Sequence, residues 1–143
     1  HARDMTSTLA DFHGSHLRVE ILQQRQVEEL YLREVFLRMR STDAIVEYGV
    51  IAIALEQFAL QEQEEIRAGE IPLGGLLHRF KVPFESAPLG FFSVPAANLT
   101  RLQRMAAKKA TCYGRFNHLA KPGGEPLAWI MEILPPGPAK AGR

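Results

Sequence analysis

One arginine in the first half of the chain lies in a setting that points to chemistry. Arg33 belongs to a segment whose residues alternate as in a β-strand, and Tyr31 and Val35 share its face. A buried cation without a partner is costly, so Arg33 needs an anionic group beside it. Because the planar guanidinium binds a carboxylate through two parallel hydrogen bonds, a small carboxylate is a fitting partner. Arg33 is therefore the first candidate for a binding site.

Other reactive side chains give weaker signals. Cys112 is the only cysteine, which excludes an internal disulfide and agrees with a reducing cytosol. As a nucleophile it would need a basic partner, for which His118 is nearest in sequence, but a small buried apolar role is the favoured interpretation. The five histidines show no metal-ligand spacing with another histidine, a cysteine or a carboxylate. The sequence therefore predicts no metal.

Length, charge and hydropathy limit the classes of function. The chain has 143 residues, which fits one domain, and 46% of them are hydrophobic. Its 17 basic and 16 acidic residues nearly cancel, which argues against a nucleic-acid partner. No apolar run reaches the ~18 residues of a membrane span, and no secretory signal is visible at the start. We therefore expect a cytoplasmic protein without a membrane span.

The first half of the chain predicts three strands after a short helix. Residues 6–13 are expected to be helical, and alternation then begins near His16. Two more strands are predicted at about 29–39 and 44–55, the latter rich in β-branched residues. They form an antiparallel hairpin around the turn at 41–43, and Arg33 lies on the first strand of that hairpin.

The second half predicts helices and then a second hairpin. A helix over 58–69 ends at Gly69, and Pro72 opens a second short helix. The next segment, 80–94, is expected to be irregular to extended. A longer helix is predicted to begin after Asn98 and to end near residue 110. Two strands follow at 111–119 and 126–134, and the turn at 122–124 joins them into a hairpin.

The order of the expected elements, three strands followed by helices and two further strands, predicts an α+β fold in which helices cover an antiparallel sheet. We expect one domain over residues 1–138 and a flexible tail over 139–143, because the segment 135–138 is rich in proline. Glu47 and Glu56 are interpreted as solvated strand ends.

Six short motifs, in this order and spacing, resemble the chorismate pyruvate-lyase family over about residues 4–136. The motifs are Asp4-Met5-Thr6, Leu32-Arg33-Glu34, Gly69-Glu-Ile-Pro72-Leu73-Gly74, Tyr113-Gly114-Arg115, Gly124-Glu-Pro126-Leu127 and Glu132-Ile-Leu-Pro135-Pro136. The resemblance implies a six-stranded antiparallel sheet with helical flaps over an internal ligand cavity. It also implies a cofactor-free lyase that converts chorismate to 4-hydroxybenzoate and pyruvate.

The same resemblance implies a set of site residues. Met5, Arg33, Leu73 and Glu132 fall where the family lines its product site, and Arg115 is a further candidate cation. Arg33 is assigned to the carboxylate of an aromatic ligand and Glu132 to its ring hydroxyl, which makes both catalytic candidates. A structural ion pair between Arg33 and Glu132 is the competing interpretation.

Three departures from the family pattern leave other functions open. The stretch 78–95 is longer, the strand after Gly49 is apolar where a basic residue is usual, and Glu132 needs a bulge or a shifted strand start to face the site. One alternative is a non-catalytic sensor, since ligand-binding domains of one class of bacterial transcription regulators have a similar fold. The other is a relative that makes another hydroxybenzoate isomer. We expect a monomer or a weak dimer.

Overall fold

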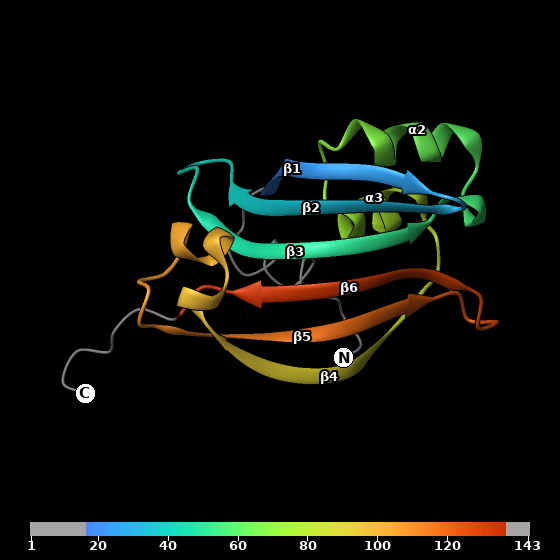
Figure 1. The fold of residues 1–143 in the computed structure, drawn as a ribbon. Coiled ribbons are helices and arrows are strands. Elements are labelled where there is room, and N and C mark those ends of the chain that lie inside the picture. Colours follow the sequence, from blue (N-terminus) through green and yellow to red (C-terminus); the bar gives the residue numbers. More distant parts are fainter. Residues whose placement is uncertain (1–16, 137–143) are drawn as a thin grey trace.

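The computed structural model describes residues 17–136 as one antiparallel sheet with helical segments on both faces (Figure 1). Its strand order is β1-β2-β3-β6-β5-β4, and every neighbouring pair is antiparallel. The strands are β1 (Leu17–Val27), β2 (Leu30–Met39), β3 (Ile45–Ala54), β4 (Glu85–Pro95), β5 (Thr111–Ala120) and β6 (Pro126–Leu134). The predicted six-stranded α+β fold is confirmed. The helix expected at 6–13 lies outside the described residues.

Two α-helices cover one face of the sheet, which we call the helical face. They are α2 (Leu60–Ala68) and α3 (Leu73–Phe80), and α3 lies behind β2 and β3 in the view of Figure 1. Gly69 ends α2 in the left-handed conformation, as predicted, and Pro72 caps α3. The buried side chains between helices and sheet are Tyr31, Ile51, Ile53, Leu55, Phe58, Ile66, Leu73, Leu76, Leu77, Leu119, Leu127 and Ala128. This cluster holds α3 over the centre of the sheet.

The segment between residues 80 and 94, expected to be irregular to extended, contains a full strand, β4. Pro88 argues against regular structure there, because proline cannot donate a hydrogen bond within a sheet. β4 is an edge strand, however, and its register shifts between Pro88 and Gly90. A proline is tolerated at such a position, because a residue at a bulge on an edge strand does not need to donate a hydrogen bond to a neighbouring strand.

The long helix expected over about 98–110 is absent from the described residues. Two short 3₁₀ helices replace it, η2 (Ala96–Asn98) and η3 (Thr100–Arg104). The amide of Ala96 donates to the carbonyl of Ala110 at 2.9 Å, so the two ends of the segment meet. A straight helix over the same residues would hold its ends roughly 20 Å apart. Leu102 is fully buried but Leu99 is exposed, so only part of the predicted inner face packs inward.

Tyr48, Glu34 and Arg101 fasten this 3₁₀ segment to the sheet. Tyr48 Oη donates to Glu34 Oε2 at 2.6 Å, and Arg101 Nε donates to the same oxygen at 3.0 Å. Burial raises the pKa of Glu34, but the hydrogen bonds from Arg101 and Tyr48 outweigh it and hold that pKa below its ordinary 4.5. Burial and the Glu34 carboxylate raise the pKa of Tyr48.

The lowered pKa of Glu34 predicts a pH-dependent contribution to stability. Its stabilising charge is fully present above the ordinary pKa of 4.5 and is lost as the pH falls through the lower folded pKa. The stability difference between the wild type and Glu34→Gln should therefore shrink between about pH 6 and about pH 3. Urea denaturation at each pH measures it, with the exposed Glu56→Gln as control. A difference that stays constant with pH would contradict this role.

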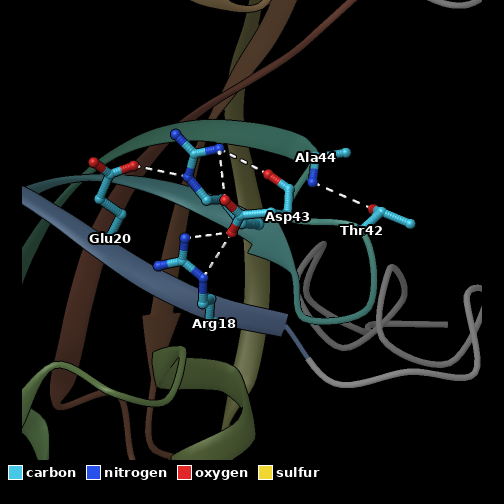
Figure 2. Close-up of polar contacts among 6 residues, drawn as sticks. Arg18, Glu20, Thr42, Asp43 and Ala44 are labelled. Atoms are coloured by element: carbon cyan, nitrogen blue, oxygen red, sulfur yellow. Dashed lines mark hydrogen bonds and ion pairs between the residues drawn. The ribbon is translucent and has the colours of Figure 1, made fainter.

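Charged residues tie the start of β1 to the β2–β3 turn (Figure 2). Arg18 Nε donates to Asp43 Oδ1 at 3.0 Å, and Arg38 Nη1 donates to the backbone oxygen of Asp43 at 2.7 Å. Arg38 also donates to Glu20 Oε1 at 2.8 Å. Asp43 adopts a φ of 65°, which aspartate tolerates better than most residues. These contacts set the register at one end of the sheet. Within residues 17–136, no helix has the length and hydropathy needed to cross a membrane.

Candidate functional site

The centre of the helical face carries charged residues from three strands. Arg33 on β2 lies across from Ile51, and one pair further along the same face Gly49 lies across from Glu132. Arg115 on β5 pairs with Glu132 from its other side. Antiparallel register therefore brings Arg33, Glu132 and Arg115, far apart in sequence, onto neighbouring positions of one face.

A pocket lies between this part of the sheet and the start of α3, with about 470 Å³ of empty space that includes the solvent at its mouth. Gly49 gives it depth, because a Cβ there would already lie 3.5 Å from Glu47 Oε2 and 3.6 Å from Val35 Cγ2. The residues that line it are Arg33, Val35, Leu37, Glu47, Gly49, Val50, Ile51, Pro72, Leu73, Gly74, Leu119, Ile130 and Glu132. Apolar walls with a few convergent charges are typical of small-molecule sites.

Arg33 is buried to 3% exposure at the floor of the pocket. Its Nη1 donates to the carbonyl oxygen of Ile66 at 3.0 Å, near the end of α2, and its guanidinium lies 6.0 Å from the Tyr31 ring centre. Burial lowers the pKa of Arg33, and Tyr31 opposes that effect. Within the described part of the chain, its Nε has no hydrogen-bond partner. The predicted placement on one face with Tyr31 and Val35 is correct.

Glu132 faces the pocket with 2% exposure. A register shift in the β5–β6 pairing, between Leu119 and Ala120, supplies the irregularity that the sequence required. Among the described residues, Glu132 is paired with Arg115, whose Nε lies 3.6 Å from Oε1. The competing interpretation of an ion pair thus has a different partner from the Arg33 that the sequence suggested.

Glu47 is the site residue that the sequence analysis missed. The interpretation as a solvated strand end is wrong, because its exposure is 3% and it lines the pocket. It pairs with Leu37, and the β2–β3 register shifts immediately beyond this pair. Strict alternation from Arg33 across the hairpin places Glu47 on the helical face. The alternation of the two strands therefore indicates an inward-facing Glu47, although the residue lies close to the turn at 41–43.

The structure gathers most of the predicted binding residues at this pocket. Arg33, Leu73 and Glu132 line it directly, while Arg115 reaches it through Glu132. Met5 lies outside the described residues. Cys112 is fully buried in the apolar cluster below the 3₁₀ segment, and burial raises the pKa of its thiol, which suits the structural role predicted for it. No group of three or more metal-ligating side chains occurs among residues 17–136.

Comparison with known proteins finds likeness only at the level of structure. No protein-family profile and no curated protein matches the chain. PhnF from Mycobacterium smegmatis matches with a TM-score of 0.64 at 10% identity, over 96% of this chain and 69% of its own. The ligand-binding domain of a protein assigned as a GntR-family transcriptional regulator, from Bordetella bronchiseptica, matches with a TM-score of 0.56 at 14% identity, over 83% and 85% of the two chains.

A third matching structure is the C-terminal domain of the histidine utilization repressor from Pseudomonas syringae. Its TM-score is 0.54 at 13% identity, over 90% of this chain and 98% of the other. These similarities show that the chain has the fold of such domains.

The expected activity of a chorismate pyruvate-lyase is wrong. The matched structures include the ligand-binding domain of a transcriptional regulator and a domain of a repressor, which point away from that activity. The resemblance therefore identified the fold correctly but assigned the wrong activity to it, together with the associated chorismate, pyruvate and 4-hydroxybenzoate chemistry. One fold carries unrelated functions, so the site itself has to support any further assignment.

Proposed function

We propose that this chain is a non-catalytic domain that senses a small molecule, as the ligand-binding part of a transcriptional regulator. The observation that carries the proposal is the buried guanidinium of Arg33 in a pocket between sheet and helix. A cation held at 3% exposure is stabilised by an anionic ligand that replaces lost water. The likeness of the fold to regulator domains supports this proposal.

The ligand that we propose is a small carboxylate with an aromatic ring, and the ring packs against the apolar walls of the pocket. Its carboxylate binds the edge of the Arg33 guanidinium where Nε points without a partner among the described residues. The walls nearest to Arg33 are apolar side chains, among them Val35, Ile51 and Leu73. A polar group at the far end of the ligand faces Glu132 and Glu47, which accept hydrogen bonds.

The connection of Arg33 to α2 suggests how binding is transmitted. The same guanidinium that meets the ligand donates to the carbonyl of Ile66, and α3 follows after only Gly69–Pro72. A ligand on Arg33 therefore acts on the end of α2 and on the start of α3, which roofs the pocket. We propose that α3 serves as a flap that closes over the ligand.

A matched pair of ligands tests the proposal. We expect 4-hydroxybenzoate to raise the melting temperature, since a ligand that binds only the folded state stabilises it. Its uncharged analogue 4-hydroxybenzamide should have no effect, because it lacks the carboxylate that Arg33 requires. Calorimetric titration of the same pair, extended to sugar acids, measures affinity directly. Absence of binding by every acid would overturn the sensor, and equal binding of acid and amide would overturn the role of Arg33.

A further inference from the structure

The wall of the ligand pocket carries charges of both signs at separate places. Among the described residues that line it, Arg33 is the cation, and Glu47 and Glu132 are the carboxylates. Each of these side chains is at most 3% exposed, so little water screens its charge. The charges of a bound molecule therefore have to match those of the wall, group by group.

Arg33 and Glu47 lie at opposite ends of one face of the β2–β3 hairpin. Arg33 pairs with Ile51, and Glu47 lies four residues before Ile51 on β3. Four residues of a strand span about 13 Å. The position between them on this face is Gly49, and a Cβ there would lie 3.5 Å from Glu47 Oε2. The Glu47 carboxylate therefore leans along the strand toward Arg33, and the position between the two charges has no side chain.

The second carboxylate of the pocket has a cation from the protein. Arg115 Nε lies 3.6 Å from Glu132 Oε1, and Arg115 reaches it from the neighbouring strand β5. With both glutamates ionised, the charges of the two arginines and of Glu47 and Glu132 balance. A ligand that brings only a carboxylate leaves this buried region with an excess negative charge, whereas a ligand that carries both signs keeps the balance.

We propose that the ligand of this pocket is a zwitterion whose carboxylate and ammonium groups stand at opposite ends of a flat apolar body. The inference rests on the proposed function and specifies the chemical class of its ligand. The carboxylate binds Arg33, whose Nε has no partner within the described part of the chain, and the body lies over Gly49. The ammonium donates to Glu47, since a carboxylate accepts several hydrogen bonds and can bind it in addition to contacts within the chain.

An ammonium gains more from Glu47 than a hydroxyl does. A hydrogen bond between two charged groups is roughly twice as strong as one between neutral groups. Glu47 is already shielded from water in the folded chain, so binding adds only the desolvation of the ammonium. An α-amino acid lacks this advantage, because its two charged groups lie on one carbon and cannot reach Arg33 and Glu47 together.

Four acids of similar size test this inference by calorimetric titration of the full chain. 4-(Aminomethyl)benzoate should bind about tenfold more tightly than 4-(hydroxymethyl)benzoate, which has a hydroxyl in place of the ammonium. 4-(Carboxymethyl)benzoate should bind more weakly than either, because it places a second carboxylate against Glu47. Phenylglycine, an isomer of the first acid with its charges on one carbon, should also bind more weakly than the first acid.

A variant of Glu47 identifies the group that recognises the ammonium. Glu47→Gln keeps the size of the side chain and removes its charge. It should lower the affinity for 4-(aminomethyl)benzoate about tenfold and change that for 4-(hydroxymethyl)benzoate less than about threefold. Glu56→Gln, at an exposed position, is the matched control and should change neither affinity. Circular dichroism checks that both variants are folded, and the comparison of acids on the wild type does not depend on them.

Two results would overturn the inference while leaving the sensor in place. One is binding of 4-(hydroxymethyl)benzoate as tightly as 4-(aminomethyl)benzoate, which would show that the pocket does not recognise an ammonium. The other is a preference for the aminomethyl acid that Glu47→Gln leaves unchanged, which would assign the recognition to another group. Absence of binding by all four acids would overturn the proposed function and this inference together, so the two failures are distinguishable.

Discussion

Replacing Arg33 with methionine is expected to remove the response to ligand while leaving the fold intact. Methionine has a similar length and keeps the apolar contacts of the side chain, but it has no charge for a carboxylate. Loss of a charge-assisted contact of this kind costs about 1.5–3 kcal/mol, which lowers affinity about tenfold to a hundredfold. Calorimetric titration with 4-hydroxybenzoate measures the change.

The stability of the Arg33→Met variant should stay within about 1 kcal/mol of the wild type, because a buried cation carries a desolvation cost that methionine avoids. The Ile66 carbonyl keeps a partner, since Gly69 N also donates to it at 3.2 Å. Arg67→Met, at an exposed position on α2, is the matched control and should change neither the free energy of unfolding nor the affinity for 4-hydroxybenzoate. An Arg33→Met variant that binds the acid as tightly as wild type would exclude Arg33 from the site.

Gly114→Ala is expected to destabilise the fold severely. A Cβ at Gly114 would lie 2.6 Å from Phe92 Cζ and still closer to the backbone oxygen of Glu132. That oxygen belongs to the central strand β6, so it cannot move without disturbing the sheet. We expect a loss of more than about 3 kcal/mol in the free energy of unfolding, or no folded protein.

Gly90→Ala provides the matched control for this substitution. Gly90 also lies in the β4–β5 pair, but a Cβ there meets nothing within 4 Å. Its free energy of unfolding should stay within about 0.5 kcal/mol of the wild type by urea denaturation. Equal stability of the two variants would show that β5 and β6 can separate at Gly114, and would contradict the close packing that positions Arg115 beside Glu132.

The activity could not be predicted from the motifs that identified the fold. Arg33, Leu73 and Glu132 do meet at one pocket, as the resemblance implied. An arginine on the floor of a pocket can serve a sensor as well as a lyase, since both must hold an anion. The motifs therefore identify the scaffold and the place where these side chains meet, and the function depends on the whole pocket.

Local sequence determined the features that depend on neighbouring residues. Alternation placed Arg33 on one face with Tyr31 and Val35. Gly69 marked the end of α2 and Pro72 the start of α3. These signals act within one helical turn or one strand. Tertiary structure alone decided that Pro88 fits an edge strand, and that residues 96–110 form short 3₁₀ turns whose ends meet instead of one long helix. It also decided that Trp129 and Phe116 remain at the surface. Each of these outcomes depends on which strand lies alongside, and strand pairing joins residues that are distant in the chain.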